Sequence, residues 1–306
     1  MKPNSLLILF ATAITLTAAT AAGQTSACQQ TSQDALRACR AAAQSSLLFA
    51  KATCDNVSNS VAQRSCRRQA RADFKTASQL CDDGFTVRQT ACARLGPQPY
   101  DPVIDPANFV STIDNPYFPL TPGTTFVYEG ITSTGLVHVD FAVTHNTKQI
   151  LGVTTVEVHD TVFTNGAVTE DTLDWFAQDK TGNVWYLGEN TVEIIDGRPT
   201  TLGGTFVSGI KRAKPGIIML AHPAVGNFTR QEFDLGNAED FADVQSLNDT
   251  VVVPAGRFTH CVRSHETTPL EPTLSEDKFY APGIGNVLTR DLTNGDEIPL
   301  IQIKVE

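Results

Sequence analysis

The sequence lacks the short signatures of several common enzyme classes. It contains no Gly-x-Ser-x-Gly nucleophile elbow, no His-Glu-x-x-His zinc motif, no P-loop and no dinucleotide-binding Gly-x-Gly-x-x-Gly. The hydrolases, zinc peptidases, nucleotide triphosphatases and dehydrogenases that depend on these motifs are therefore excluded. No remaining motif names a reaction.

Metal-binding cysteine patterns are absent as well. The chain has no Cys-x-x-Cys pair and no histidine before His138, so the cysteines in its first third do not form a zinc motif. We expect neither a bound metal nor a cofactor.

Long apolar runs are confined to the N-terminus. Residues 1–23 combine one early lysine, an apolar stretch from Leu6 and a run of small residues, which is the pattern of a cleaved signal peptide. No later segment is apolar enough to span a membrane. We therefore expect a secreted or periplasmic protein without a transmembrane segment.

Positive charge is scarce in most of the chain. Residues 24–97 carry ten Lys and Arg against five Asp and Glu, whereas residues 98–306 carry twelve against twenty-eight. The acidic character of the larger part excludes nucleic acid as a partner, because phosphates require a positive field.

Six cysteines are present in a mirrored spacing, with steps of 11, 15, 12, 15 and 11 residues. An antiparallel helical hairpin with disulfides between its legs requires such a mirror. This geometry favours three pairs over the other connectivities that six cysteines allow, namely Cys28–Cys92, Cys39–Cys81 and Cys54–Cys66.

Residues 24–97 are therefore predicted to be a disulfide-bonded helical hairpin. Thr31 and Asp34 resemble a capping box that starts the first helix just after Cys28, and Gly84 is expected to end the second helix. Basic side chains share one face of the second helix and offer a docking strip for an acidic envelope or protein partner, or form an ordinary solvated surface: Arg64, Arg67, Arg68, Arg71 and Lys75.

The rest of the chain changes to a period of two. Residues 98–109 form a proline-rich linker, and residues 110–306 contain about a dozen alternating segments separated by turn signals such as Asn165-Gly166. This pattern predicts a large antiparallel β-barrel or strongly curved sheet, and thus an α+β protein.

Three segments of this β domain resemble a family of exported bacterial β-rich proteins. They are NPYFPLTPGTTFVYEG at residues 115–130, DWFAQDKTGNVWYLGE at residues 174–189 and FYAPGIGNV at residues 279–287. The resemblance implies export, a bacterial origin and a β-rich fold, and it assigns no activity. The helical hairpin is not part of the family pattern and looks like an appended module.

Two groups of residues are candidates for acid–base chemistry. If Thr181-Gly182 is a two-residue turn, Asp174 and Glu189 lie opposite each other, and paired carboxyl groups can divide the roles of acid and base. Arg230 and Glu232 would share one face of another strand. Solvated acids and a surface ion pair are the alternative interpretations.

The candidates for ligand binding are Trp175, Trp185, Tyr186 and Arg230. The three aromatic residues could form a stacking surface for a sugar, although such pairs are more often plain sheet packing. Cys261 has no partner in its own domain, and a buried thiol is the simplest interpretation.

Two functions are compatible with these patterns. The first is an exported binding protein whose β domain holds a small apolar or sugar-like ligand, with the basic hairpin as a docking module. The alternative is a secreted hydrolase or lyase that uses carboxylate acid–base catalysis. The absence of catalytic signatures favours the first.

Overall fold

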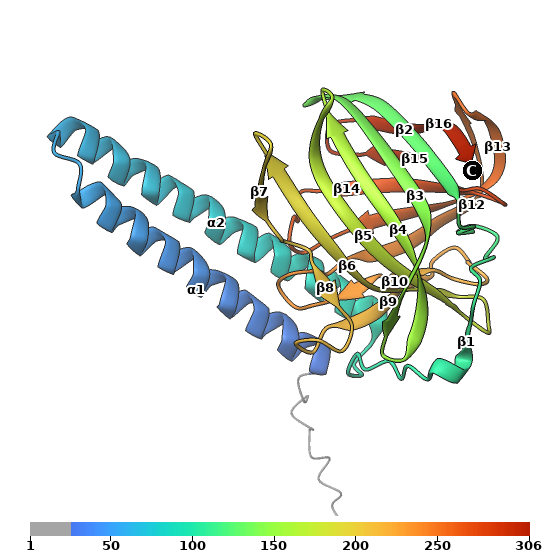
Figure 1. The fold of residues 1–306 in the computed structure, drawn as a ribbon. Helices are drawn as coiled ribbons and strands as arrows, with labels where there is room; N and C mark the ends of the chain where they lie inside the picture. Colours follow the sequence, from blue (N-terminus) through green and yellow to red (C-terminus); the bar gives the residue numbers. More distant parts are fainter. Residues whose placement is uncertain (1–25) are drawn as a thin grey trace, which may run out of the picture.

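The computed structural model describes residues 26–306, so the expected signal peptide (1–23) lies outside the described residues. Two antiparallel helices, α1 (Ala27–Asp55) and α2 (Ser60–Leu95), precede a nearly closed antiparallel β-barrel (Figure 1). The predicted α+β class is confirmed. None of the helices in residues 26–306 has the length and apolar character needed to cross a membrane.

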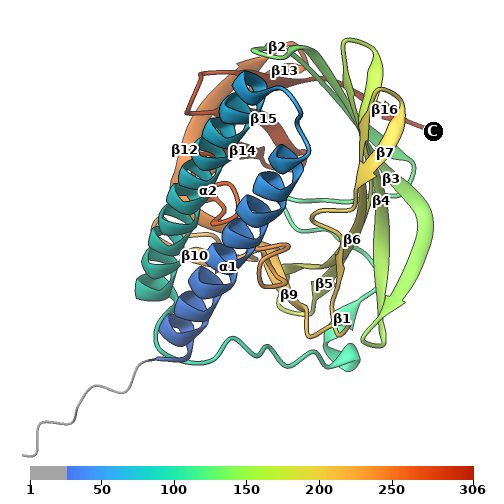
Figure 2. The ribbon, with the colours of Figure 1, turned by 90° about the vertical axis from the view of Figure 1, so that its left-hand side faces the viewer.

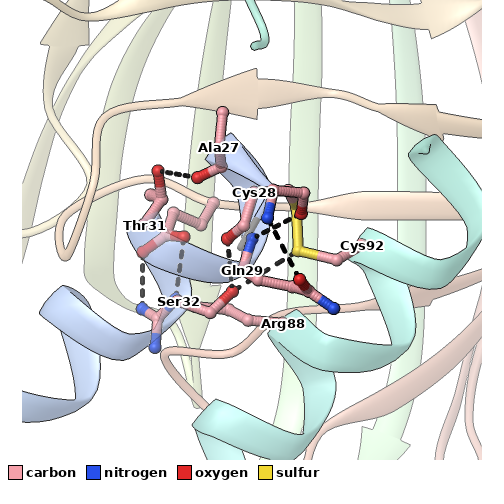
Figure 3. The surroundings of a disulfide bond; sticks show 9 residues. Ala27, Cys28, Gln29, Thr31, Ser32, Arg88 and Cys92 are labelled. Carbon is pink, nitrogen blue, oxygen red and sulfur yellow. Dashed lines mark hydrogen bonds and ion pairs between the residues drawn. A yellow bond between two sulfur atoms is a disulfide. The ribbon is translucent and has the colours of Figure 1, made fainter. Parts of the chain in front are cut away.

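Three disulfides connect the two helices in the predicted order. Cys28–Cys92 lies at the base of the hairpin (Figure 3), Cys39–Cys81 in the middle and Cys54–Cys66 at the tip. The Cα atoms of each pair are 5.6–5.7 Å apart, as a disulfide requires. Because the alanine-rich interface between the helices buries few large side chains, these bonds supply stability that the thin core lacks.

The first helix begins earlier than its sequence suggests. Ser26 is the N-cap and forms a capping box with Gln29, whereas the hydroxyl of Thr31 donates to the carbonyl oxygen of Ala27 inside the first turn. The prediction that Thr31 and Asp34 form the cap is therefore wrong. Both pairs fit the capping pattern, and the earlier pair adds one more turn of helix.

The second helix does not end at Gly84. It continues to Leu95, and Gly96 follows with a φ of 86°. Gly84 has another role, because a Cβ atom there would lie 2.3 Å from the carbonyl oxygen of Pro269. The glycine permits close approach of the helix to the barrel.

Sixteen strands form one antiparallel sheet in the part of the chain that the structure describes. Their bounds are β1 (Phe109–Val110), β2 (Thr124–Thr132), β3 (Gly135–Ile150), β4 (Val153–Thr164), β5 (Ala167–Asp179), β6 (Val184–Ile195), β7 (Arg198–Thr201), β8 (Phe206–Val207), β9 (Lys214–Met219), β10 (Phe228–Arg230), β11 (Glu232–Phe233), β12 (Phe241–Val253), β13 (Gly256–Thr267), β14 (Ser275–Ala281), β15 (Gly285–Asp291) and β16 (Glu297–Val305).

Thirteen of these strands follow one continuous path, β10-β12-β13-β14-β15-β16-β2-β3-β4-β5-β6-β9-β11. The two end strands, β10 and β11, are separated in sequence only by Gln231. One short segment therefore pairs first with β12 and then with β9, which nearly closes the barrel. The predicted turn at Asn165-Gly166 is confirmed, with positive φ at both residues between β4 and β5.

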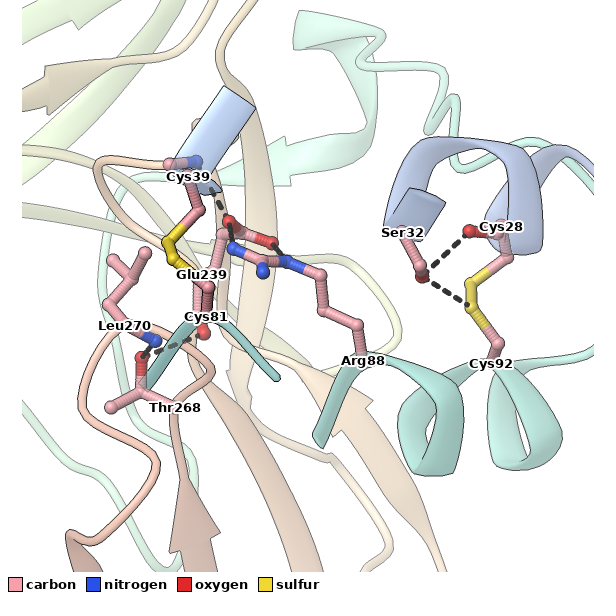
Figure 4. Close-up of polar contacts among 10 residues, drawn as sticks. Cys28, Ser32, Cys39, Cys81, Arg88, Cys92, Glu239, Thr268 and Leu270 are labelled. Carbon is pink, nitrogen blue, oxygen red and sulfur yellow. Dashed lines mark hydrogen bonds and ion pairs between the residues drawn. A yellow bond between two sulfur atoms is a disulfide. The ribbon is translucent and has the colours of Figure 1, made fainter. Parts of the chain in front are cut away.

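The hairpin docks on the barrel through its base. Arg88 forms two hydrogen bonds to the buried Glu239, at 2.6 and 3.0 Å (Figure 4), and Arg94 forms a similar pair with Asp243. Beyond these contacts the helices lead away from the strands (Figures 1 and 2). All five residues of the basic strip lie on this distal part and are exposed: Arg64, Arg67, Arg68, Arg71 and Lys75.

Candidate functional site

The barrel encloses a cavity of about 560 Å³. Part of its wall is apolar and aromatic, built from the segment before β2 and from β2, β3, β5 and β9. The residues of this part include Phe118, Leu120, Phe126, Phe141, Phe176 and Ile218. The volume falls in the range of pockets that hold small organic ligands.

The other part of the wall is strongly acidic. Eight carboxyl groups line the cavity, and we call them the acidic cluster: Asp160, Glu170, Asp174, Glu189, Glu232, Asp240, Glu266 and Glu276. Lys278 contributes the one ammonium group among the residues that line this cavity. The buried Oδ1 atom of Asp160 has no hydrogen-bond partner among residues 26–306.

Strand alternation places these groups inside the barrel. On β5, Glu170, Asp174 and Phe176 point into the cavity, and the intervening Trp175 points outward. The same alternation brings Glu276 and Lys278 inward on β14.

Asp174 and Glu189 lie opposite each other on β5 and β6, so the predicted pairing is confirmed. The predicted two-residue turn is wrong, since the loop is closed by a hydrogen bond from the amide of Asp179 to the carbonyl of Asn183. The longer loop would by itself move the pairing of β5 and β6 by one residue. A register shift between Trp175 and Phe176, where Leu187 is an extra residue on β6, cancels that displacement and restores the pairing of Asp174 with Glu189. It also brings residues 186 and 189 to the same side of β6.

Tyr186 joins the two carboxyl groups. Its hydroxyl forms a short contact with Asp174 and lies 2.9 Å from Oε2 of Glu189. A phenol carries one proton and can donate to only one of the two. When the phenol donates to Asp174, the contact with Glu189 is a hydrogen bond only if the Glu189 carboxyl is protonated and donates to the phenolic oxygen.

Burial raises the pKa of several members of the acidic cluster. It raises the pKa of Asp174 to about 7, and burial together with the nearby charge of Asp174 raises the pKa of Glu189 to about 8. Burial also lifts the pKa of Asp240 to about 6 and the pKa values of Asp160 and Glu232 well above their ordinary range. Near neutral pH, Asp174, Glu189 and Asp240 can therefore gain or lose protons.

The lysine in the cavity is already paired. Nζ of Lys278 lies 2.8 Å from Oε2 of Glu266, and Oε1 of the same carboxylate accepts hydrogen bonds from Ser264 and Tyr280. Despite its burial, the pKa of Glu266 is held below its usual value, chiefly by the charge of Lys278. The other seven carboxyl groups of the cluster form no ion pair with a Lys or Arg side chain among residues 26–306.

The structure separates Arg230 from Glu232. Glu232 lines the barrel cavity, whereas Arg230 points toward the base of the helical hairpin. The expectation that both share one face is wrong because the strand is interrupted at Gln231, whose backbone marks the change of partner from β12 to β9. Arg230 therefore does not belong to the barrel site.

The two tryptophans lie outside the cavity. Trp175 is buried on the outer surface of the barrel in a second apolar cluster, with the ammonium of Lys148 3.3 Å from its ring centroid. Trp185 packs edge-on against Phe109. Of the three aromatic residues proposed as a stacking surface, Tyr186 alone lines the cavity, because its neighbours in alternation face outward.

Sequence reasoning missed most of the acidic cluster. The period of two could have revealed more of this cluster, because residues two or four apart on a strand share one face. Glu276, Lys278 and Tyr280 share a face of β14 in this way, and Glu170 shares a face of β5 with Asp174. The segments 115–130, 174–189 and 279–287 each contribute cavity residues, among them Tyr128, Glu189 and Tyr280.

The remaining candidates for chemistry are weak. No group of three His, Cys, Asp or Glu side chains in residues 26–306 has an arrangement that could hold a metal ion. Cys261 is a fully buried free cysteine, and burial raises the pKa of its thiol, so the thiol stays protonated.

Comparisons with known proteins are sparse. No family model and no curated protein matches the chain. Among solved structures, the chain has a likeness to a protein described as a putative lipoprotein from Parabacteroides distasonis, with 14% sequence identity and a TM-score of 0.34. The match covers 61% of this chain and 98% of the other. A likeness of this degree carries no information about ligand or activity.

Proposed function

We propose that the β domain is a binding module for a small organic amine with an apolar body. The observation that carries this proposal is the excess of acidic over basic groups in the cavity, where eight carboxyl groups face one lysine that is already paired with Glu266. A protonated amine would supply the ion-pair partner that these carboxyl groups lack among residues 26–306. Its hydrocarbon part would pack against Phe126, Phe141 and Phe176.

Other ligand classes fit the wall less well. A neutral apolar molecule would cover the acidic cluster without replacing the water that solvates it, which is unfavourable. A sugar could bond to the carboxyl groups, but Trp175 and Trp185 are not available to stack on it, since both lie outside the cavity.

The proposal is tested with octylamine as the probe and isothermal titration calorimetry as the measurement. We expect octylamine to bind, and octanol and octanoate to bind much more weakly at the same site. Asp174→Asn combined with Glu189→Gln should weaken octylamine binding, whereas Asp171→Asn, which removes an exposed carboxyl from the same strand, should not. Equal affinity for octanol and octylamine would contradict the proposal.

A second function is favoured by a specific observation, the contact of one phenol, that of Tyr186, with both Asp174 and Glu189. Two carboxyl groups with pKa values of about 7 and about 8, in contact with one phenol, can act as acid and base near neutral pH. We therefore keep a secreted hydrolase or lyase as the alternative function, with Glu232 nearby in the same cavity. Arg230 has no part in this scheme.

This alternative is tested by screening glycosides and esters with the wild-type chain and with Glu189→Gln. Activity that is lost in the variant while folding and octylamine binding persist would establish catalysis and demote the binding function. Activity that is equal in both proteins would come from another site or from a contaminant.

We also propose that the distal part of the hairpin docks on an acidic partner at the cell envelope or outside the cell. The disulfides support an oxidising compartment, and the basic strip is exposed and remote from the barrel. The probe is sedimentation with vesicles of phosphatidylcholine and phosphatidylglycerol. Changing Arg67, Arg68 and Arg71 to Gln should abolish binding at low salt.

The matched control for the docking test removes the same charge from the barrel, by changing Lys180, Arg198 and Arg257 to Gln. All three are exposed. Equal loss of vesicle binding in both triple variants would show that only net charge matters and would contradict a docking strip.

A further inference from the structure

A second cavity, of about 260 Å³, lies where the base of the hairpin meets the barrel. We call it the junction cavity. The Cys28–Cys92 disulfide, the end of α2 and the segment after it form one side. The barrel forms the other side with β9 to β12, and the residues that matter here are Leu95, Tyr100, Lys214, Arg230, Phe233 and Phe241.

Arg230 is the unusual member of this wall. The residue is 8% exposed, and its Nε and Nη1 atoms are buried without a hydrogen-bond partner among residues 26–306. Its guanidinium carbon lies 4.5–5.0 Å from the ring centroids of Tyr100, Phe233 and Phe241. Aromatic faces attract a cation, but they carry no negative charge that neutralises it.

The nearby charges compensate Arg230 only in part, because it shares the one carboxylate of Glu239 with Arg88. Glu239 is engaged by Arg88 through two hydrogen bonds (Figure 4), and Lys214 is paired with Asp101 at 3.0 Å. One buried positive charge is therefore left over at the junction. Arginine keeps its proton even when buried, so the charge cannot be removed by titration, and an unpaired buried charge is strongly unfavourable.

We propose that the junction cavity binds a small organic carboxylate, with its anionic group on Arg230 and its apolar body against Leu95, Phe233 and Phe241. Guanidinium groups recognise carboxylates and phosphates alike. The apolar and aromatic wall favours a carboxylate with a hydrocarbon part. The cavity is smaller than the roughly 300–1,000 Å³ typical of sites for drug-sized ligands, which indicates a short acid.

The test uses hexanoate as the probe and the full chain with its disulfides intact. We expect calorimetry to show binding of hexanoate but not of hexanol or hexylamine. Arg230→Met should weaken hexanoate binding by about tenfold or more. Arg257→Met removes the same charge from an exposed position and should change nothing.

Nuclear magnetic resonance of the wild-type chain decides the question if Arg230→Met does not fold. The guanidinium Nε–H signal of Arg230 should shift when hexanoate is added, and inorganic phosphate should shift it less. An unmoved signal, no binding to the wild type at millimolar hexanoate, or equal binding by Arg230→Met would each overturn the proposal.

The junction site does not depend on the function proposed for the barrel. Asp174→Asn should weaken octylamine binding and leave hexanoate binding intact, and Arg230→Met should do the reverse. Failure of one site therefore does not count against the other.

Discussion

Asp174 and Glu189 face each other across β5 and β6 and are connected by a single phenol, that of Tyr186. The arrangement places two carboxyl groups with raised pKa values on one phenol, inside a barrel whose wall is otherwise rich in carboxyl groups. It gives the cavity a dependence on pH and a preference for positive charge, and both consequences can be measured.

Tyr186→Phe should destabilise the fold and raise the pKa of Asp174 further. The hydroxyl contact favours the ionised form of Asp174 and opposes the effect of burial. Its loss leaves the carboxyl without that partner, at a cost of about 1–3 kcal/mol in the free energy of unfolding. Urea unfolding and carboxyl carbon titration by nuclear magnetic resonance would measure both effects. Tyr117→Phe serves as control, and an equal change in that variant would contradict a specific role.

Stability should fall as the pH rises from about 5 to about 8.5. The folded-state pKa values of about 6 for Asp240, about 7 for Asp174 and about 8 for Glu189 lie above the unfolded values near 4. The folded chain therefore binds more protons than the unfolded chain in this window. The stabilisation is complete below pH about 4 and is lost as the pH rises through each folded-state value, by an amount on the order of a few kcal/mol.

Thermal unfolding across this pH range would measure the effect. In the variant that combines Asp174→Asn with Glu189→Gln, the curve of stability against pH should be flatter than in the wild type. A wild-type curve that rises between pH 5 and 8.5, or a variant curve with the same slope, would show that these carboxyl groups do not carry the raised pKa values.

Affinity for octylamine should increase with pH over the same interval. The amine stays protonated, whereas Asp174 and Glu189 must release protons to bind it, so binding is favoured where those protons are already lost. Calorimetry in buffers of different ionisation enthalpy should detect the protons released near pH 7. Affinity that does not change between pH 5.5 and 8.5 would place the ammonium elsewhere.

Arg88→Met should destabilise the docked hairpin by about 3–5 kcal/mol, because it removes both charge-assisted hydrogen bonds to the carboxyl of Glu239, which is 1% exposed. The double variant Arg88→Met with Glu239→Leu should recover much of this loss, because it removes both members of the buried ion pair and leaves neither without its partner. Denaturant unfolding of the four proteins of the cycle gives the coupling energy. A double variant as unstable as the sum of the two single variants would refute the coupling.

Gly84→Ala should destabilise the protein, although alanine is favoured over glycine in an isolated helix by about 1 kcal/mol. The added Cβ would lie 2.3 Å from the carbonyl oxygen of Pro269, so α2 and the barrel would have to separate. Hydrogen exchange of the amides around Pro269 would report the loosened contact. Ser65→Ala, on an exposed part of the same helix, should instead be neutral or stabilising.

The order of disulfides and the architecture could be predicted from local patterns. The mirrored cysteine spacing predicts the disulfide pairs, because the steps between cysteines are the same in both helices of an antiparallel hairpin. Each cysteine of the first helix then lies beside its mirror partner in the second, whatever surrounds the hairpin. The period of two and the turn at Asn165-Gly166 determine an antiparallel sheet for a similar reason. The prediction that Asp174 and Glu189 lie opposite each other is also confirmed, although its reasoning assumed a shorter loop and no register shift. These two differences displace the pairing in opposite directions and cancel.

What the tertiary structure decided is which face of each strand lies inside. The alternation of side chains along a strand predicts that Asp174 and Trp175 point to opposite faces of the sheet, but it does not predict which face lines the cavity. The closure of the barrel through β10 and β11 made that choice, and it placed Trp175 outside, Glu232 inside and Arg230 at the hairpin. Such contacts join residues far apart in sequence, as with Arg88 and Glu239, so no local pattern carries them. The sequence by itself determined the elements and their covalent links, and only the packing of those elements created the two cavities.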